Sequence, residues 1–96
     1  MTTIIWSPQS LHDLEAIRGY IAQDSPRYAA LVVQRIVAVV ERLEAFPESG
    51  RVVPELNIPD IREVIVRPYR VVYRCRSDAV EIATVFRSSR QLPEIA

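Results

Sequence analysis

The sequence contains no lysine and a single histidine, so its basic side chains are almost all guanidinium groups. All twelve residues in the combined lysine and arginine count are arginines, and twelve acidic residues balance them to a net charge of zero. Arginine stays protonated at neutral pH and binds carboxylates and phosphates through a planar fork. We therefore expect the basic residues to bind anions rather than to transfer protons.

Cysteine and long apolar runs are also scarce. The lone Cys75 cannot form a disulfide within the chain, which fits a reducing cytoplasm, and its strand-like surroundings predict a buried structural thiol. The longest apolar run, residues 28–40, is interrupted by Gln34 and Arg35 and is too short to span a bilayer. The N-terminus lacks a basic region followed by an apolar core, so no secretory signal is expected. These features predict a cytoplasmic protein without a membrane segment.

The composition fits one globular domain over residues 1–96. Hydrophobic residues make up 49% of the chain and charged residues 25%, and no repeat, linker or low-complexity segment interrupts it. The charge is unevenly distributed. Residues 1–50 carry four arginines against six acids, whereas residues 61–90 carry seven arginines against three acids, a net of +4. An acidic partner is therefore expected on the second half of the chain.

Two Ser-Pro pairs predict where two helices begin. In Ser7-Pro8 and Ser25-Pro26, the serine can cap free amides and the proline suits the first helical position. Apolar residues recur at helical spacing after the first pair, at Leu11, Leu14, Ile17 and Ile21. The helix predicted after Ser25-Pro26 is apolar around more than half of its circumference. That pattern predicts burial between a sheet and the first helix, or else a face left for a partner chain.

Four strand-like runs complete the pattern, at residues 2–6, 61–67, 69–76 and 79–86. Within residues 69–76, arginines alternate with apolar residues, which predicts a row of guanidinium groups on the sheet face turned away from the helices. The order is β-α-α-β-β-β. We predict an α+β fold in which a two-helix hairpin packs on an antiparallel sheet.

Five segments occur in an order and spacing similar to those of a known family: DLEAIRGYIAQDSPRYA, RLEAFPESGRVVPEL, IREVIV, YRVVYR and VFRSSRQLP. Together they resemble the ParE branch of the RelE/ParE superfamily, the toxins of type II toxin–antitoxin modules, over Ile4 to Pro93. The resemblance implies the same fold and a small, acidic cognate antitoxin with a DNA-binding N-terminus, whose tail wraps the toxin and neutralises it. It is also compatible with a homodimer or a toxin–antitoxin hetero-oligomer.

The superfamily has two known activities, and this sequence favours the one that needs no proton transfer. ParE-like members inhibit DNA gyrase by binding, whereas RelE-like members cut messenger RNA on the ribosome. Cleavage through the 2′-hydroxyl requires a proton acceptor and a proton donor. Many relatives carry a histidine where this chain has Arg87, no tyrosine follows Tyr73, and the lone His12 is expected on the solvated side of the first helix. We expect a gyrase inhibitor that is not an enzyme and holds no cofactor and no metal.

Two alternatives stay open. A ribonuclease would have to use Glu55, Glu63 or Tyr73 for proton transfer while arginines hold the phosphates. Its catalytic residues would be Arg62, Arg70 and Arg87. An inactive homologue, retained for complex formation and promoter regulation, is the second alternative.

Six arginines are predicted to contact gyrase, gyrase-bound DNA or the antitoxin. They are Arg51, Arg62, Arg70, Arg74, Arg87 and Arg90. The competing explanation is that arginines on a sheet surface form weak ion pairs with Glu63 and Glu81.

Overall fold

Strand β1 and a pair of helices come first along the chain, and a group of strands follows. In this computed structural model, residues 2–95 are described. The elements are β1 (Thr3–Trp6), α1 (Pro8–Ala22), α2 (Pro26–Glu41), the 3-10 turn η1 (Arg42–Glu44), β2 (Arg51–Val52), β3 (Ile61–Val66), β4 (Tyr69–Cys75) and β5 (Ala79–Arg87). The predicted helices and all four predicted strands are present, and β2 is an additional short strand.

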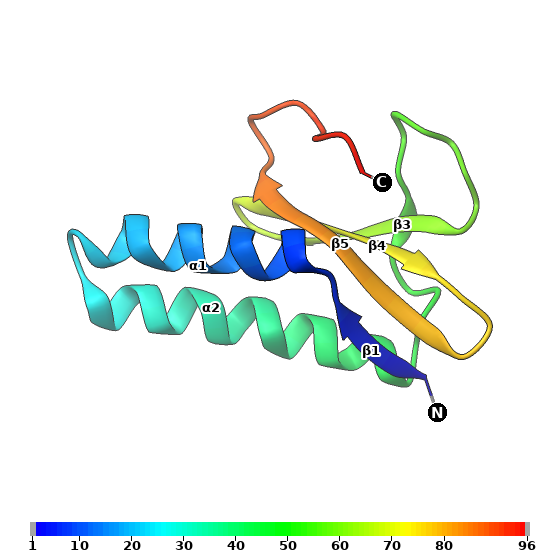
Figure 1. The fold of residues 1–96 in the computed structure, drawn as a ribbon, viewed down its shortest axis with the longest axis horizontal. Helices are drawn as coiled ribbons and strands as arrows, with labels where there is room; N and C mark the ends of the chain where they lie inside the picture. The colour runs from blue at the N-terminus through cyan, green and yellow to red at the C-terminus, as the bar shows by residue number, and fades with distance from the viewer. Residues whose placement is uncertain (1, 96) are drawn as a thin grey trace.

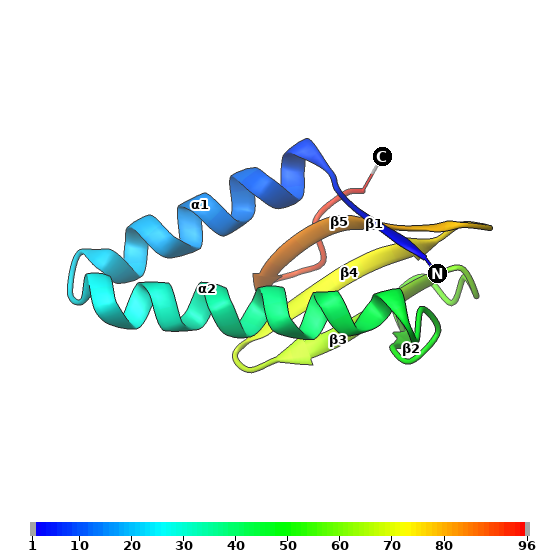
Figure 2. The ribbon, with the colours of Figure 1, turned by 90° about the horizontal axis from the view of Figure 1, so that it is seen from below.

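Serine caps begin both helices, as the sequence predicts. The Ser7 side chain accepts the Ser10 N–H at 3.0 Å, and the Ser25 side chain accepts the Tyr28 N–H at 3.1 Å. A proline stands in the first turn of each helix. The helices form a hairpin along one face of the sheet, and the end of the hairpin projects beyond the sheet (Figures 1 and 2). No helix formed by residues 2–95 combines the length and hydropathy that crossing a membrane requires.

The five strands form one sheet in the order β1-β5-β4-β3-β2. The pairs β2–β3, β3–β4 and β4–β5 are antiparallel, whereas β1 runs parallel to β5, with Thr3 opposite Ala79. The predicted α+β architecture with a two-helix hairpin on the sheet is therefore confirmed. The parallel edge pair is a detail that the sequence pattern did not reveal, because strand direction depends on where the chain returns after the helices.

Beyond the end of β1, the N-cap residue of α1 and one side chain within α1 form hydrogen bonds with the edge of β5. The register of β1 on β5 ends at Ile82, and the Ser7 Oγ then donates to the Ala83 carbonyl at 3.0 Å. Further along, one carboxylate oxygen of Asp13 accepts the Val85 N–H at 3.0 Å and the Thr84 hydroxyl at 2.6 Å. Polar side chains thus satisfy the backbone of β5 beyond the point where its partner strand stops.

The main core lies between the helices and the sheet. Its buried members are Val32, Ile36, Val40, Leu43, Val66, Tyr69, Val71, Tyr73, Val80, Ile82 and Val85. Leu14, Ile17 and Ile21 of α1 pack against it, whereas Leu11 is exposed. Helix α2 therefore buries one stripe, at Val32, Ile36 and Val40, against the sheet and α1, as predicted, whereas Tyr28 and Leu31 are exposed near its start.

A second apolar cluster covers the opposite face of the sheet. It contains Val53, Ile61, Val72, Ala83 and Phe86, with Leu56, Leu92 and Ile95 packed against it. The connection between β2 and β3 and the segment after β5 supply its cover, and both lie on the side of the sheet away from the helices (Figure 1). The predicted face is confirmed for Arg70 and Arg74, which contact Phe86 and the Ile95 carbonyl on this side, but Arg70 is buried because two irregular segments cover part of the face.

Candidate functional site

A cluster of four charged side chains lies at the covered face of the sheet. Arg70 of β4 is 8% exposed and makes two parallel bonds to the Glu55 carboxylate, at 2.7 and 2.8 Å. Its Nε also donates to Glu63 at 2.6 Å, and its guanidinium lies 5.0 Å from the centre of the Phe86 ring. Arg51 donates to the other oxygen of Glu63 at 2.6 Å. Arg70 thus ties the connection that carries Glu55 to the sheet.

This cluster makes acid stability depend on Glu55. The hydrogen bonds that the Glu55 carboxylate accepts from Arg70 lower the pKa of Glu55 from 4.5 to about 2. Because this pKa lies below its value in the unfolded chain, the carboxylate stabilises the fold above about pH 4.5 and loses that contribution as the pH falls towards 2. Glu55→Gln is therefore expected to flatten the dependence of the free energy of unfolding on pH in this window, measured by urea titrations.

Glu41→Gln, on the exposed side of α2, is the matched control for loss of one carboxylate and should retain the wild-type slope. If the free energy of unfolding of the Glu55→Gln variant falls as steeply at low pH as that of the wild type, the Glu55–Arg70 ion pair is not the source of this pH dependence.

Arg62 closes a tight turn beside this cluster. Its guanidinium donates to the Gly50 carbonyl at 2.9 Å, and its buried Nε has no hydrogen-bond partner among the described residues. The Gly50 N–H donates to the Tyr73 hydroxyl at 2.9 Å. The Cys75 thiol, which is half-buried, donates to the Pro47 carbonyl at 3.4 Å. Arg62, Tyr73 and Cys75 therefore hold the segment that connects η1 to β2.

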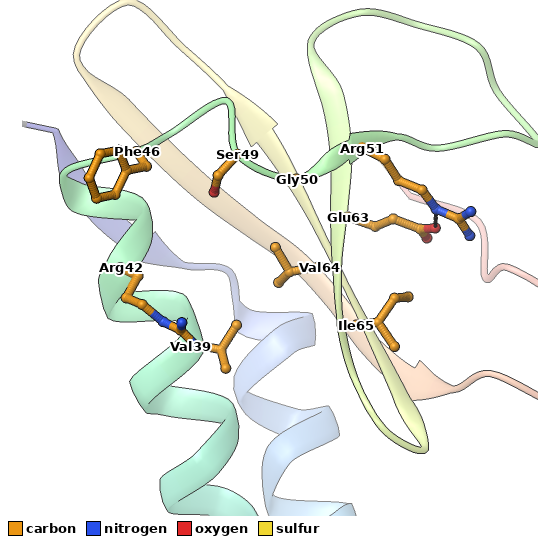
Figure 3. A pocket seen from close by; sticks show the side chains of 9 residues that line it. All are labelled: Val39, Arg42, Phe46, Ser49, Gly50, Arg51, Glu63, Val64 and Ile65. Atoms are coloured by element: carbon orange, nitrogen blue, oxygen red, sulfur yellow. Dashed lines mark hydrogen bonds and ion pairs between the residues drawn. The ribbon is translucent and has the colours of Figure 1, made fainter.

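A first groove of about 560 Å³ lies between the end of α2 and β3. Figure 3 shows Val39 and Arg42 on its helix side and Val64 and Ile65 on its strand side. Gly50, Arg51, Glu63, Ser49 and Phe46 complete the lining. Phe46 and Ile65 are exposed apolar residues, and Arg42 and Arg51 add positive charge. The groove therefore combines an apolar surface with guanidinium groups.

A second groove of about 610 Å³ lies between α1, the end of β5 and the segment that follows it. Arg87 and Arg90 line it, on a turn closed by a bond from the Arg90 N–H to the Arg87 carbonyl at 3.0 Å. Asp13 and Tyr20 line it from α1. The guanidinium of Arg87 lies over the Tyr69 ring, 5.9 Å from its centre. Both arginines are exposed, and neither forms an ion pair with another residue in the described range 2–95.

The six predicted arginines are thus divided among three places. Arg51, Arg62 and Arg70 lie around Glu63 and the Gly50 turn, and Arg70 is buried there. Arg74 pairs with Glu81 at 3.6 Å. Arg87 and Arg90 line the second groove. The structure brings together only the last two as open, unpaired cations, and their contact with a partner remains a prediction.

Two of the predicted candidates for proton transfer are buried, and the third, Glu55, is exposed but ion-paired. Tyr73 is fully buried, and burial raises the pKa of its hydroxyl. Glu55 is paired with Arg70, and Glu63 is buried between two arginines. His12 is exposed on α1 and lines neither groove. Within residues 2–95, no cluster of three or more histidine, cysteine, aspartate or glutamate residues could hold a metal ion.

Among the residues of the second groove that were not singled out from the sequence, Asp13 and Tyr20 carry polar or aromatic groups. Asp13 and Tyr20 are seven positions apart, and Ala16 and Ile17 lie between them at helical spacing. This i, i+3, i+4, i+7 pattern places the four residues on one face of α1, where all four line the groove. A polar residue at the start of such a face and an aromatic residue at its end were the signal available in the sequence.

Comparisons with known proteins identify the family to which this sequence is similar. The family described as "ParE toxin of type II toxin-antitoxin system, parDE" matches residues 4–92. Y4kP of Sinorhizobium fredii is 38% identical over 94 residues, which cover 96% of this chain and 94% of Y4kP. Toxin RelE2 of Caulobacter vibrioides is 34% identical over 91 residues, which cover 94% of this chain and 99% of RelE2.

A solved structure extends the likeness to the fold. The structure titled "Chromosomal ParDE TA system from P. aeruginosa" superposes with a TM-score of 0.75 and 26% identity, covering 91% of this chain and 96% of that chain. The match over residues 4–92, together with the shared arrangement of helices and sheet, shows that this chain belongs to the family of ParE toxins of type II toxin–antitoxin systems.

Proposed function

We propose that this type II toxin inhibits DNA gyrase by binding it, and that a small acidic cognate antitoxin neutralises the toxin. The observation that carries the proposal is the contrast between two sets of side chains. Arg87 and Arg90 are open to a partner in the second groove, whereas Glu63 and Tyr73 are buried and the exposed Glu55 is ion-paired with Arg70.

This contrast favours binding over cleavage for a chemical reason. A guanidinium group remains protonated at neutral pH, so it can hold an anion but cannot accept a proton from a ribose hydroxyl. The three arginines of the ribonuclease alternative do not converge, because Arg70 is buried under the second cluster while Arg87 faces the second groove. Gyrase bound to DNA offers phosphates, and an acidic antitoxin offers carboxylates, both of which suit exposed arginines.

Expression and supercoiling assays test the proposal. Induction of the chain without an antitoxin is expected to stop growth, and co-expression of the cognate antitoxin should restore it. The purified protein is expected to inhibit gyrase supercoiling while messenger RNA stays intact. Arg87→Ala combined with Arg90→Ala should abolish growth arrest and raise the inhibitory concentration about tenfold or more, because a hydrogen bond to a charged group contributes about 1.5–3 kcal/mol.

The matched control combines Arg27→Ala with Arg35→Ala, which removes the same charge from exposed positions on α2 and should leave inhibition unchanged. Cleavage of ribosome-bound messenger RNA with normal supercoiling would replace the proposal by the ribonuclease alternative. Normal growth after induction would instead support an inactive homologue.

A further inference from the structure

The second groove has the size and the lining of a site for a small anionic ligand. Its volume of about 610 Å³ lies within the range of roughly 300–1,000 Å³ that is usual for ligand pockets. Val85 and Tyr69 contribute apolar surface, and Arg87 and Arg90 contribute positive charge. The question is which anion fits these walls.

The two cations are held in place by the turn that carries them. The Ser88 N–H donates to the Pro68 carbonyl at 2.8 Å, which anchors the turn to the β3–β4 connection. The Arg90 N–H donates to the Arg87 carbonyl, and the Tyr69 ring supports the Arg87 guanidinium. Two forked cations presented by one anchored turn match the oxygens of a phosphate group.

Among residues 2–95, Asp13 is the one acidic side chain that lines this groove, and its carboxylate already accepts hydrogen bonds. One oxygen accepts from Thr84 and Val85, and the other accepts from the Gln9 side chain at 2.8 Å. Because Asp13 occupies the Val85 N–H, an extended peptide cannot pair with the edge of β5 at this point. The groove therefore favours a compact ligand over an added strand.

Tyr20 supplies the remaining feature, which is a flat and accessible ring. It lines the groove from α1, and 72% of its surface is exposed. An exposed aromatic ring beside guanidinium groups is the combination on which nucleic-acid bases stack while their phosphates are held.

We propose that the groove between α1 and the Arg87–Arg90 turn binds a nucleoside phosphate, with Tyr20 stacking on the base and the two arginines holding the phosphate. The ligand is either a free nucleotide or one nucleotide of a single strand, since both present the same chemistry. This inference does not depend on gyrase as the target. The proposed function requires only that this chain bind gyrase. The present inference adds that the chain also binds a nucleotide directly.

The test uses the purified protein and a short fluorescent oligothymidine. Anisotropy is expected to show binding at about 50 mM salt and weaker binding at about 200 mM. Thymidine monophosphate should compete for the site, whereas thymidine, which lacks the phosphate, should not. If the monophosphate competes as strongly as the unlabelled strand, the ligand is the free nucleotide. If the strand competes far better, the ligand is nucleic acid, and an oligouridine probe then distinguishes DNA from RNA.

Variants connect binding to the named residues. Arg87→Ala with Arg90→Ala should weaken binding at least about tenfold and lower the salt slope by about 0.7, the contribution of one neutralised phosphate on a single strand. Tyr20→Ala should also weaken binding about tenfold, whereas Tyr28→Ala, exposed on α2, should not. Unchanged thermal midpoints would show that these exposed substitutions leave the fold intact.

Two results would overturn the inference. One is the absence of oligonucleotide and nucleotide binding by the wild type at about 50 mM salt. The other is an equal loss of binding in the Arg27→Ala, Arg35→Ala control, which would indicate general attraction to positive charge. Gyrase inhibition is measured separately, so a toxin that binds nucleotides without inhibiting gyrase refutes only the proposed target. A toxin that inhibits gyrase without binding nucleotides refutes only this site.

Discussion

Arg70→Met is expected to lower the free energy of unfolding by about 3–5 kcal/mol, the usual cost of removing one partner from a buried ion pair. The Glu63 side chain has no exposed surface, and Arg70 supplies one of its two cationic partners. Methionine retains much of the apolar contact with Phe86 but leaves the buried carboxylate with Arg51 alone. For a domain of this size, the loss corresponds to a fall in Tm of roughly 10–40 °C.

A double-mutant cycle separates the buried charge from general packing. Arg70→Met combined with Glu63→Met should recover most of the stability, because apolar residues of similar volume can replace a buried ion pair at little cost. Arg51→Ala should cost about 1 kcal/mol or less, since the Arg51 side chain is 63% exposed. Equal losses in the single Arg70 variant and the double variant would show that the uncompensated Glu63 charge is not the cause.

Gly50→Ala is expected to cost about 3 kcal/mol, because overpacking and a lost hydrogen bond act together. A Cβ at this position would lie 2.5 Å from the Glu63 carbonyl oxygen and 2.5 Å from the Tyr73 hydroxyl. The first is backbone within the sheet, and the second belongs to a fully buried ring, so neither can move freely. The turn that lines the first groove would shift, and the bond from Gly50 to Tyr73 would lengthen.

Gly19→Ala is the matched control, since no atom lies within 4 Å of the Cβ that it would add in α1. It should stabilise the protein by about 0.5–1 kcal/mol through helix propensity. Adding Tyr73→Phe to Gly50→Ala should relieve only part of the loss, because the Glu63 carbonyl remains in the way. Urea denaturation of the wild type and the three variants provides the free energies of unfolding, and a Gly50→Ala variant as stable as the wild type would contradict the tight contact.

The helical half of this fold could be predicted because its signals are local. Ser7-Pro8 and Ser25-Pro26 mark helix starts within a few residues, and the structure contains both caps. The strands also follow from short runs of alternating residues. Strand β2 contains only Arg51 and Val52, which is too short to produce a periodic pattern.

The covered face of the sheet could not be predicted, because its contacts join segments that are far apart in sequence. Leu56 and Leu92 pack against one cluster from two different irregular segments. In the sequence, Arg70 alternates with apolar residues along a strand, and an exposed arginine would produce the same pattern. Contacts with Glu55, fifteen residues earlier in the chain, and with Glu63 and Phe86 make Arg70 a buried structural residue. In contrast, Arg87 ends the last strand and Arg90 lies in the turn that follows it, and their exposure agrees with that local context.

The pairing of β1 with β5 has a consequence for synthesis of the protein. These strands stand near opposite ends of the chain, yet they are neighbours in the sheet. On the ribosome, α1 and α2 can pack against each other early in synthesis. Strand β1 cannot pair until β5 has emerged from the ribosome. Such long-range closure slows folding. We therefore expect a nascent chain that stops short of β5 to lack part of both apolar clusters, so that toxicity begins only after translation has passed the last strand.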